Sequence, residues 1–467
     1  MDISLQFLGA AQCVTGSKYL LTLKDSPATQ QQLLVDYGLF QGLKELRLRN
    51  REALPVAPAD VAIVILTHAH IDHSGYLPKL VRDGFRGRIF CTEPTADLLS
   101  IMLLDSARLQ EEEAAFANKK GYAKHHPAEP LYTQADVEKL LPLVETVAYD
   151  APLALLNRNL TLTFREAGHI LGSAIVELVV QGARQSRQLV FSGDLGRYNN
   201  PVMLDPAPVA HADVLLVEST YGDRNNRTES PEADVAHVVN QAHERGGVLL
   251  IAAFAVGRTQ TLLYYLKKLR AEGRVPQMPV YVDSPMGIRV SELYPRHPTA
   301  HRLGHGNVFD FPDLHFVTEA AESKKLNDLT GPAIIISASG MCTGGRIVHH
   351  LFNRLRRPQD TLLLVGYQAE GTRGRRLQEG ETDIKLFGEL VPVRCHIEHL
   401  DGMSAHADRQ ELLRWLGNFQ EPPMRTFVVH GELKAAEALA QTLRQEKGWP
   451  HVVVPTYLET VRLFEDI

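Results

Sequence analysis

The chain has 467 residues, of which 44% are hydrophobic and 22% are charged, and its 49 basic and 55 acidic side chains give a net charge of −6. This length predicts two or three domains, or one domain with a large insertion, and the composition excludes a disordered or fibrous protein. The negative net charge excludes a protein that binds polyanions through its overall charge, so a nucleic acid would have to bind a local basic patch.

The first half of the chain is rich in short strands. Strands are predicted in stretches dense in Val, Leu and Ile, namely 3–8, 19–23, 33–36, 61–66, 160–164, 174–180, 188–192 and 213–217. The continuous apolar run VAIVIL at 61–66 suits a strand that is buried on both faces. A surface helix is predicted at 95–116, above a charged EEE run. These elements predict a layered core of helices and sheets.

After Gly222 helices and buried strands alternate, which favours a parallel sheet. The predicted elements are helices at 232–245 and 258–272 and strands at 248–253, 279–282 and 333–337. Beyond about Arg394 short strands return. They are predicted at 395–399, 426–429 and 452–455, with amphipathic helices at 408–418 and 432–446. We interpret the middle of the chain as an insertion into a core that is completed by the C-terminal part.

Targeting and cysteine patterns point to the cytoplasm. No apolar run approaches the roughly 18 residues that a membrane-spanning helix needs, so we expect no membrane contact. The N-terminal sequence MDIS lacks the basic start and cleavage site of a secretory signal. The four cysteines are widely separated and never form C-x-x-C, which excludes a disulfide framework or a thiolate zinc finger.

The most informative stretch is LTHAHIDHSG at 66–75, which follows a predicted buried strand. It places His68, His70, Asp72 and His73 in one loop, and imidazole and carboxylate groups suit Zn²⁺ and related ions. A lone loop histidine is by default solvated or packed in the core, but the joint pattern favours a metal site. The loop holds more ligands than one open tetrahedral site needs, so we expect two metals to share it.

Two further motifs, AGHILGS at 167–173 and FSGDLGR at 191–197, place His169 and Asp194 at predicted strand ends. Flanking glycines permit close backbone approach to an ion, and the two side chains could supply one terminal and one bridging ligand. Taken alone, GHILGS could be a turn with a surface histidine.

The HxHxDH loop, the downstream Gly-His and the Ser-Gly-Asp together resemble the metallo-β-lactamase superfamily. Further motifs resemble its β-CASP branch of RNA- and DNA-cutting enzymes: VESTYG at 217–222, FAVGRTQ at 254–260, DSPMG at 283–287, SASGM at 337–341, GYQAEGT at 366–372, SAH at 404–406 and VHGE at 429–432. Within that branch the sequence is most similar to bacterial and archaeal relatives of the endonuclease subunit of the cleavage and polyadenylation factor. The match covers essentially the whole chain.

The resemblance implies an α/β (α+β) fold, an αββα metallo-β-lactamase sandwich with an inserted αβα β-CASP domain. The sandwich would comprise residues 1–222 and 404–467, and the insertion residues 223–403. The sequence shows neither the N-terminal RNA-binding domains of archaeal relatives nor the C-terminal dimerisation domain of ribonuclease J, so we expect neither module. A homodimer is expected by analogy only.

The resemblance also implies two Zn²⁺ ions and their ligands. One ion would be held by His68, His70 and His169, the other by Asp72, His73 and His430, with Asp194 bridging both. Asp36, in LVDYG, would orient a metal-bound histidine or water, or alternatively close a tight turn.

The implied catalytic residues are His406, Glu218 and Asp194. A metal-bridging hydroxide would attack the phosphodiester and leave 5′-phosphate and 3′-hydroxyl ends. His406 would protonate the departing sugar oxygen, and a carboxylate at Glu218 would raise the pKa of that histidine and fix its tautomer.

Loops of the inserted domain carry the substrate-binding candidates, because guanidinium groups there could hold RNA phosphates; a solvated face is the alternative. These candidates are Arg258, Ser339, Arg346, Thr372 and Arg373. The adjacent pairs 125–126 and 349–350, both His-His, are left out of the site because neighbouring residues point in different directions.

The predicted function is a zinc-dependent endoribonuclease that acts on RNA, preferably single-stranded, in RNA processing or decay, with its cleft between the two domains. A histidine at position 430, where an apolar residue marks the DNA-repair nucleases, favours RNA. The alternatives are a 5′-exoribonuclease, a DNA nuclease of the β-CASP repair branch, a thioester or lactam hydrolase, and a non-catalytic RNA-binding subunit.

Overall fold

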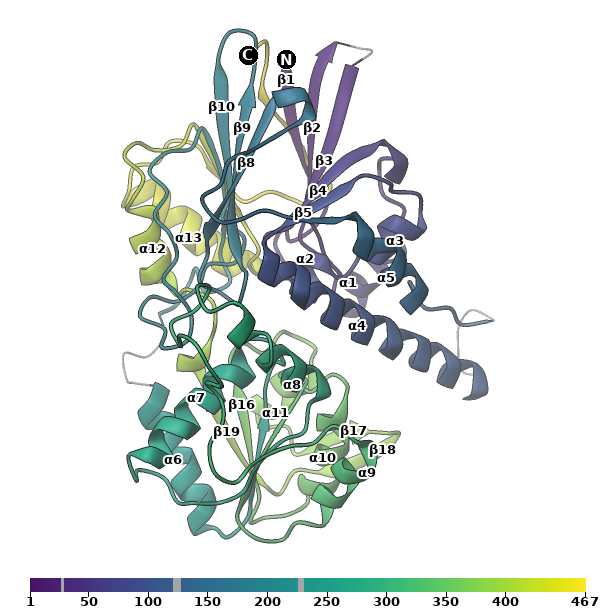
Figure 1. Cartoon of the computed structure of the whole chain (residues 1–467), viewed down its shortest axis with the longest axis vertical. Helices are drawn as coiled ribbons and strands as arrows, with labels where there is room; N and C mark the ends of the chain where they lie inside the picture. The colour runs from purple at the N-terminus through teal and green to yellow at the C-terminus, as the bar shows by residue number, and fades with distance from the viewer. Residues whose placement is uncertain (27–28, 121–126, 226–230) are drawn as a thin grey trace. The chain divides into compact units, whose positions relative to one another are not determined.

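The computed structural model describes residues 1–26, 29–120, 127–225 and 231–467 (Figure 1). The chain divides into two compact units. Unit 1 consists of Met1–Asn200, Leu204–Asn225 and His406–Ile467, and unit 2 of Pro201–Met203 and Asn226–Ala405. No helix in the described ranges has both the length and the apolar character needed to span a bilayer.

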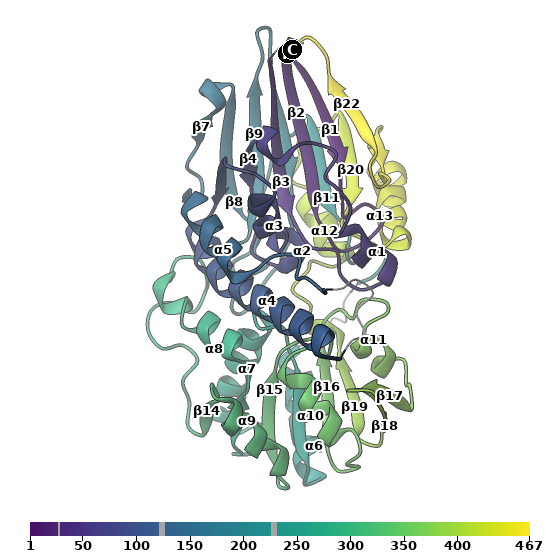
Figure 2. The ribbon, with the colours of Figure 1, turned by 90° about the vertical axis from the view of Figure 1, so that its right-hand side faces the viewer.

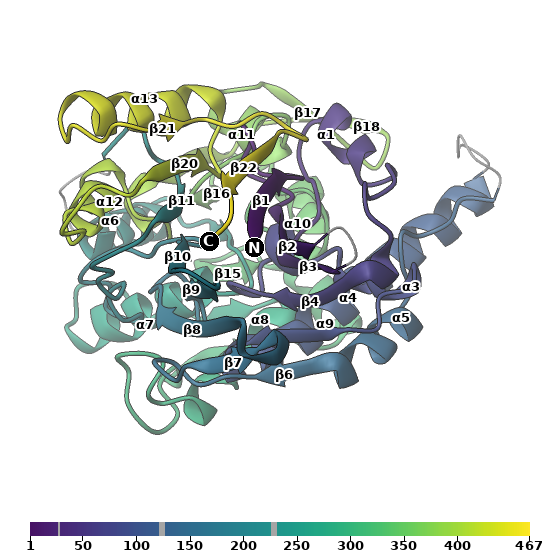
Figure 3. The ribbon, with the colours of Figure 1, turned by 90° about the horizontal axis from the view of Figure 1, so that it is seen from above.

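The described part of unit 1 contains two seven-stranded sheets that lie face to face (Figure 3). The first sheet has the order β22 (Thr460–Phe464), β1 (Asp2–Phe7), β2 (Lys18–Ser26), β3 (Thr29–Tyr37), β4 (Val61–Ile65), β5 (Arg88–Cys91) and β6 (Val144–Thr146). The second has the order β21 (Val452–Val453), β20 (Arg425–Val429), β11 (Val214–Glu218), β10 (Ser186–Phe191), β9 (Ala174–Gln181), β8 (Leu160–Glu166) and β7 (Leu153–Leu155).

The main core of unit 1 lies between these sheets. Along β1 every second side chain is buried, as expected for a strand with one face toward a core. These inward residues, including Leu5, belong to one cluster with Val176 and Leu216 of the opposite sheet. In β4 the run VAIVI is buried almost throughout, because helices cover its second face.

Helices cover the outer faces of both sheets. Those beside the first sheet (Figure 2) are α1 (Lys44–Arg49), α2 (Ile71–Ser74), α3 (Leu77–Arg82), α4 (Glu93–Lys120) and α5 (Gln134–Leu140). On the second sheet, α12 (Arg409–Leu416) and α13 (Leu433–Gln445) bury Trp415 and Leu439 against Val190 and Leu215. This arrangement confirms the predicted αββα sandwich.

The described part of unit 2 contains a six-stranded sheet whose pairings are all parallel. Its order is β14 (Leu314–Phe316), β13 (Val280–Val282), β15 (Ala333–Ser337), β12 (Val248–Ala252), β16 (Thr361–Val365) and β19 (His396–Leu400). Its helices are α6 (Pro231–Glu244), α7 (Arg258–Ala271), α8 (Pro285–Ser291), α9 (Ala320–Lys325), α10 (Arg346–Arg354) and α11 (Arg373–Gln378). A hairpin of β17 (Asp383–Leu386) and β18 (Glu389–Pro392) completes the unit.

The alternation of helices and strands after Gly222 therefore does form a parallel sheet. β19 pairs in parallel with β16, within unit 2. β19 thus lies within residues 223–403, the range that was assigned to the insertion, although a short strand by itself carries no signal of which sheet it joins.

Candidate metal centre

The loops that carry the metal-site motifs leave one edge of unit 1. β8, β10, β11 and β20 all run in the same direction in the second sheet, so their carboxyl ends share an edge. These ends carry, in the same order, His169, Asp194, Glu218 and His430. In the first sheet β4 leads into the loop and short helix α2 that hold the remaining candidates.

The first cluster consists of His68, His70, His169 and Asp194, whose ligand atoms all lie within 4.8 Å of one another. His70 Nδ1 is 3.1 Å from His68 Nε2 and 3.2 Å from His169 Nε2. Asp194 Oδ2 lies 3.5 Å from the first of these Nε2 atoms and 3.6 Å from the second. Three imidazoles and one carboxylate oxygen thus converge on one point.

The second cluster consists of Asp72, His73 and His430, and the other oxygen of Asp194 faces it. The two Nε2 atoms are 3.2 Å apart, and His430 Nε2 is 3.4 Å from Asp72 Oδ2. Asp194 Oδ1 lies 3.2 Å from His73 Nε2 and accepts no hydrogen bond from the described residues. One carboxylate therefore connects the two clusters.

Both clusters fit divalent metal ions. Ring nitrogens only 3.1 to 3.2 Å apart need a proton or a cation between their lone pairs. Burial lowers the pKa of His70 to about 4 and lowers the pKa values of His68 and His169 well below the usual value for histidine, so these rings are neutral at pH 7. Burial raises the pKa of Asp194, but His430 and His73 lower it more, so the carboxylate stays ionised.

Side chains behind the clusters orient the imidazoles. Asp36 Oδ2 lies 2.8 Å from His73 Nδ1, and its other oxygen accepts a 2.8 Å hydrogen bond from the Thr67 amide. Thr67 Oγ1 lies 3.0 Å from His68 Nδ1, and Thr220 Oγ1 lies 3.1 Å from His430 Nδ1. In each of these rings the contact occupies Nδ1 and leaves Nε2 to face the cluster.

Three residues that contact these imidazoles, Thr67, Thr220 and Ser17, were not anticipated from the sequence. Thr67 and Thr220 lie inside the motifs LTHAHIDHSG and VESTYG, so the motifs held a signal for them. Ser17, fully buried, places its Oγ 3.3 Å from His73 Nε2. No pattern around Ser17 in the sequence indicates this position, which follows from the pairing of β2 with its neighbours.

A third group lies beside the clusters. His406 Nδ1 is 3.1 Å from Glu218 Oε1 and 3.9 Å from Asp194 Oδ2, and these three residues form a further set that could hold a metal. The fully buried Glu218 also accepts a 2.8 Å bond from the Leu195 amide. Burial lowers the pKa of His406, but the carboxylates of Glu218 and Asp194 raise it more, and the net shift is upward.

The substrate-binding candidates lie in unit 2, in loops that follow the adjacent strands β15, β12 and β16. Arg258 begins α7 and is buried. The Ser339 hydroxyl is 3.0 Å from that of Thr343, and Arg373 Nη1 donates to the Thr343 carbonyl at 3.0 Å. Thr372 accepts a hydrogen bond from the Arg375 amide and so caps α11.

Arg346 is used largely inside unit 2. Its Nη1 donates to Asp283 Oδ1 at 2.7 Å and to the Val317 carbonyl at 2.9 Å, and Nη2 donates to the Thr318 carbonyl at 2.6 Å. His350 Nε2 lies 2.6 Å from Asp283 Oδ2, so this histidine belongs to the same buried cluster. His125 and His126 lie outside the described residues.

Three family models match the chain in sequence order. A metallo-beta-lactamase superfamily domain matches residues 28–194, a Beta-Casp domain residues 259–377, and a Zn-dependent metallo-hydrolase RNA specificity domain residues 390–455. The first match contains six of the seven metal-ligand candidates, and the third contains His430.

Relatives of known name extend over nearly the whole chain. Ribonuclease TTHA0252 of Thermus thermophilus is 38% identical over 443 residues, which cover 93% of this chain and 94% of the relative. The transcription termination factor FttA of Methanosarcina mazei is 32% identical over 482 residues, which cover 98% of this chain and 71% of the relative. FttA of Methanocaldococcus jannaschii is 29% identical over 480 residues, covering 99% and 72%.

A solved structure shares the fold. The crystal structure of a protein of unknown function from Enterococcus faecalis V583 superposes with a TM-score of 0.55 at 13% identity, covering 99% of this chain and all of the other.

Proposed function

Because the chain belongs to the β-CASP family of the metallo-β-lactamase superfamily and is a metal-dependent hydrolase, we propose that it is a zinc-dependent endoribonuclease. The product ends would be a 5′-phosphate and a 3′-hydroxyl. The observation that carries this proposal is the pair of ligand clusters joined by Asp194.

The metal assignment follows the two clusters. One Zn²⁺ would be held by His68, His70 and His169, the other by Asp72, His73 and His430, and Asp194 would contact both ions. When bound, such a pair activates a water and neutralises charge on a phosphoryl oxygen. Asp36 would act indirectly, by holding the His73 ring.

His406 would supply the remaining step. As the water oxygen joins the phosphorus, the bond from phosphorus to the 3′ oxygen breaks, and that oxygen needs a proton. Because His406 Nδ1 faces Glu218, the proton would leave from Nε2. A histidine in this role contributes about 10² to 10⁴ in rate.

RNA is the substrate that the comparisons favour. The RNA specificity model covers both His406 and His430, and one relative carries the name ribonuclease. In unit 2, Arg258, Ser339, Arg346, Thr372 and Arg373 would contact or shape the path of the strand, which we expect to be single-stranded. The protein would work in the cytoplasm in RNA processing or decay, and a homodimer stays a prediction by analogy.

The domain assignment is part of the proposal. Residues 1–222 and 404–467 would form the metallo-β-lactamase domain and residues 223–403 the β-CASP domain. The first and second family models fall within these ranges, while the RNA specificity model, 390–455, extends across the second boundary.

A circular RNA tests the proposal, because only an endonuclease can open a circle. We expect the zinc-loaded protein to linearise it and to leave 5′-phosphate ends, and we expect His73→Ala, Asp194→Ala and chelation to abolish the reaction. His211→Ala, at an exposed histidine of unit 1, serves as the control. A protein that digests only linear RNA would be an exonuclease, and one that cuts only DNA of the same sequence would belong to the repair branch.

A further inference from the structure

Unit 1 carries a basic strip, which we define as Lys44, Arg47, Arg49 and Arg51 of α1 and the residues after it. No carboxylate oxygen of a described residue lies within 4.0 Å of the charged nitrogens of these four side chains, so none of them forms an ion pair in the described part of the chain. Arg165 of the same unit, in contrast, is paired with Asp150 at 2.6 Å. In a chain of net charge −6, such a strip is a local site for a polyanion.

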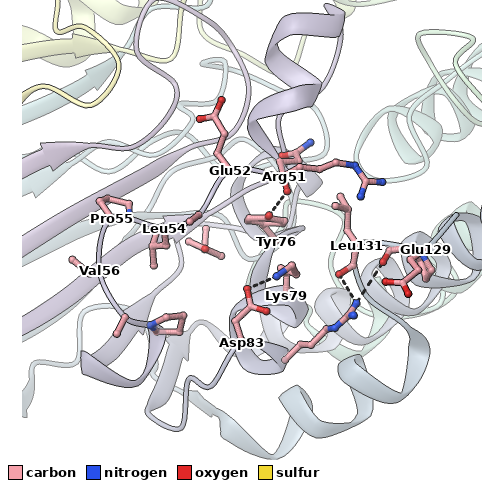
Figure 4. A pocket seen from close by; sticks show the side chains of 17 residues that line it. Arg51, Glu52, Leu54, Pro55, Val56, Tyr76, Lys79, Asp83, Glu129 and Leu131 are labelled. Atoms are coloured by element: carbon pink, nitrogen blue, oxygen red, sulfur yellow. Dashed lines mark hydrogen bonds and ion pairs between the residues drawn. The ribbon is translucent and has the colours of Figure 1, made fainter. Parts of the chain in front are cut away.

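A cavity of about 580 Å³ adjoins the strip (Figure 4). Tyr37 and Tyr76, from β3 and the segment after α2, form part of its lining, with their rings stacked at 5.2 Å. The loop 53–58 contributes Ala, Leu, Pro and Val side chains. This volume lies within the roughly 300–1,000 Å³ of pockets that bind drug-sized ligands, and a nucleotide is of that size.

Tyr37 is one of the residues that line this cavity. The side chain is only 3% exposed, yet no described residue forms a hydrogen bond with its hydroxyl group. The Tyr76 hydroxyl, in contrast, is bonded to the Asn50 carbonyl, as the dashed line in Figure 4 shows. A hydroxyl group without a protein partner is free to hydrogen-bond a polar group of a bound molecule.

The charges around the cavity leave Arg51 available. Lys79 is paired with Asp83, and Arg82 donates to the Leu131 carbonyl at 3.1 Å. Figure 4 shows the pair of Lys79 and Asp83 below Tyr76. Glu52 accepts a 2.8 Å hydrogen bond from Tyr457, which leaves Glu129 as an opposing carboxylate of the lining. Arg51 belongs to both the strip and the cavity.

The cavity is built on the same segments as the metal centre. Tyr37 directly follows Asp36, which contacts His73, and the Tyr76 amide donates to the Tyr37 carbonyl at 2.9 Å. Tyr76 follows α2, the helix of Asp72 and His73. Adjacent residues of a strand point to opposite faces, so the cavity and the centre use opposite sides of one stretch of backbone.

We propose that the cavity and the basic strip form a second RNA-binding site, distinct from the metal centre. A base of a single-stranded RNA would enter the cavity, with the Tyr37 hydroxyl hydrogen-bonded to its edge and the 53–58 loop against its apolar face. The phosphates on either side of that base would lie along the strip. This inference rests on the proposed function, and it gives long RNA a contact that short RNA lacks.

RNA binding by fluorescence anisotropy tests this site, in a His406→Ala background that prevents cutting. We expect Arg51→Gln to weaken binding of a long single-stranded RNA and to reduce the slope of log affinity against log salt by about 0.7, the value of one phosphate contact. Tyr37→Phe should weaken it about fivefold, the effect of one lost hydrogen bond. Ala57→Trp, which fills the cavity, should act in the same direction.

The matched control is Arg184→Gln, at an exposed arginine in the turn between β9 and β10. It should change neither affinity nor slope, and no variant should alter binding of an RNA a few nucleotides long. Unchanged thermal unfolding of each variant establishes that the fold is intact.

Unaltered binding and an unaltered salt slope in Arg51→Gln and Tyr37→Phe would overturn the second site. Displacement of the long RNA by poly-glutamate at equal charge concentration would also overturn it, because the strip would then bind any polyanion. These results do not affect the proposed function if the protein without substitutions still cuts RNA. If the protein without substitutions neither binds nor cuts any RNA, the proposed function itself is wrong.

Discussion

At the scale of single residues, the centre depends on which nitrogen of each imidazole faces the ions. His73 contacts Asp36 through Nδ1, and His68 and His430 contact threonine hydroxyls in the same way. These contacts fix the ring orientation and the tautomer. The rigidity of the site therefore comes from side chains that touch no metal themselves.

Asp36→Asn tests this orientation directly. We expect metal affinity to fall by about 10- to 100-fold, because the amide cannot hold the His73 ring as the carboxylate does. Asn tolerates the left-handed backbone of Asp36, whose φ is 59°, so the change is confined to the side chain. Competition with a chromogenic chelator measures the effect.

The control is Asp150→Asn, since Asp150 also has a positive φ, of 58°, but pairs with Arg165 at the surface. It should retain metal like the parent. Equal retention by both variants would remove Asp36 from the site.

Glu218→Gln tests the role of His406 through pH. Burial lowers the pKa of His406, and the carboxylates of Glu218 and Asp194 raise it by more. A proton donor works only below its pKa, so the raised value extends activity to higher pH. Removing the Glu218 charge should move the alkaline limb of the kcat profile to lower pH. An alkaline limb that stays in place would show that His406 does not donate the proton.

At the scale of elements, the centre is built where strands end. Parallel strands bring distant loops to one edge, and the loops then pack backbone against backbone. A Cβ added at Gly38, just after β3, would lie 1.6 Å from the Asp72 carbonyl oxygen. The glycine is thus required by the contact between the end of β3 and helix α2.

Gly38→Ala should accordingly displace α2 and with it Asp72 and His73. We expect loss of metal from that cluster and destabilisation by several kcal/mol, since the clash is with backbone and cannot be relieved by a side-chain rotation. Gly331→Ala is the control, because a Cβ there meets no atom within 4 Å. Metal analysis and thermal unfolding measure the two effects, and a Gly38→Ala protein that binds metal normally would contradict the account.

The sequence predicts elements well where one strong pattern decides them. The apolar runs of β4, β11 and β12 are found as strands, and the ligand candidates gather because short motifs encode them. Ser17 and the pairing partner of β19 depend on tertiary contacts that no local pattern carries. Arg346 looks the same in sequence whether it meets a phosphate or, as in the structure, Asp283.

At the scale of the whole molecule, the candidate residues divide between the units. All of the proposed metal ligands belong to unit 1, whereas the substrate-binding candidates in glycine-bearing loops belong to unit 2. Metal binding should therefore stabilise one unit selectively. The second RNA site also lies in unit 1, so the proposed RNA contacts are distributed over both units.

Calorimetry with and without a chelator tests this division. Ions at roughly 1,000 times their Kd stabilise the state that binds them by about 4 kcal/mol. We expect chelation to lower the unfolding temperature of the transition that belongs to unit 1 and to leave that of unit 2 in place. A chelator that shifts both transitions equally would contradict the assignment.

The central claim is that seven side chains, drawn from distant stretches of unit 1, hold a pair of metal ions joined by Asp194. Elemental analysis of metal-replete protein, combined with an anomalous-scattering map, tests it most directly. We expect two zinc ions per chain, one in each cluster, with Asp194 contacting both. A single occupied position, or none, would contradict it.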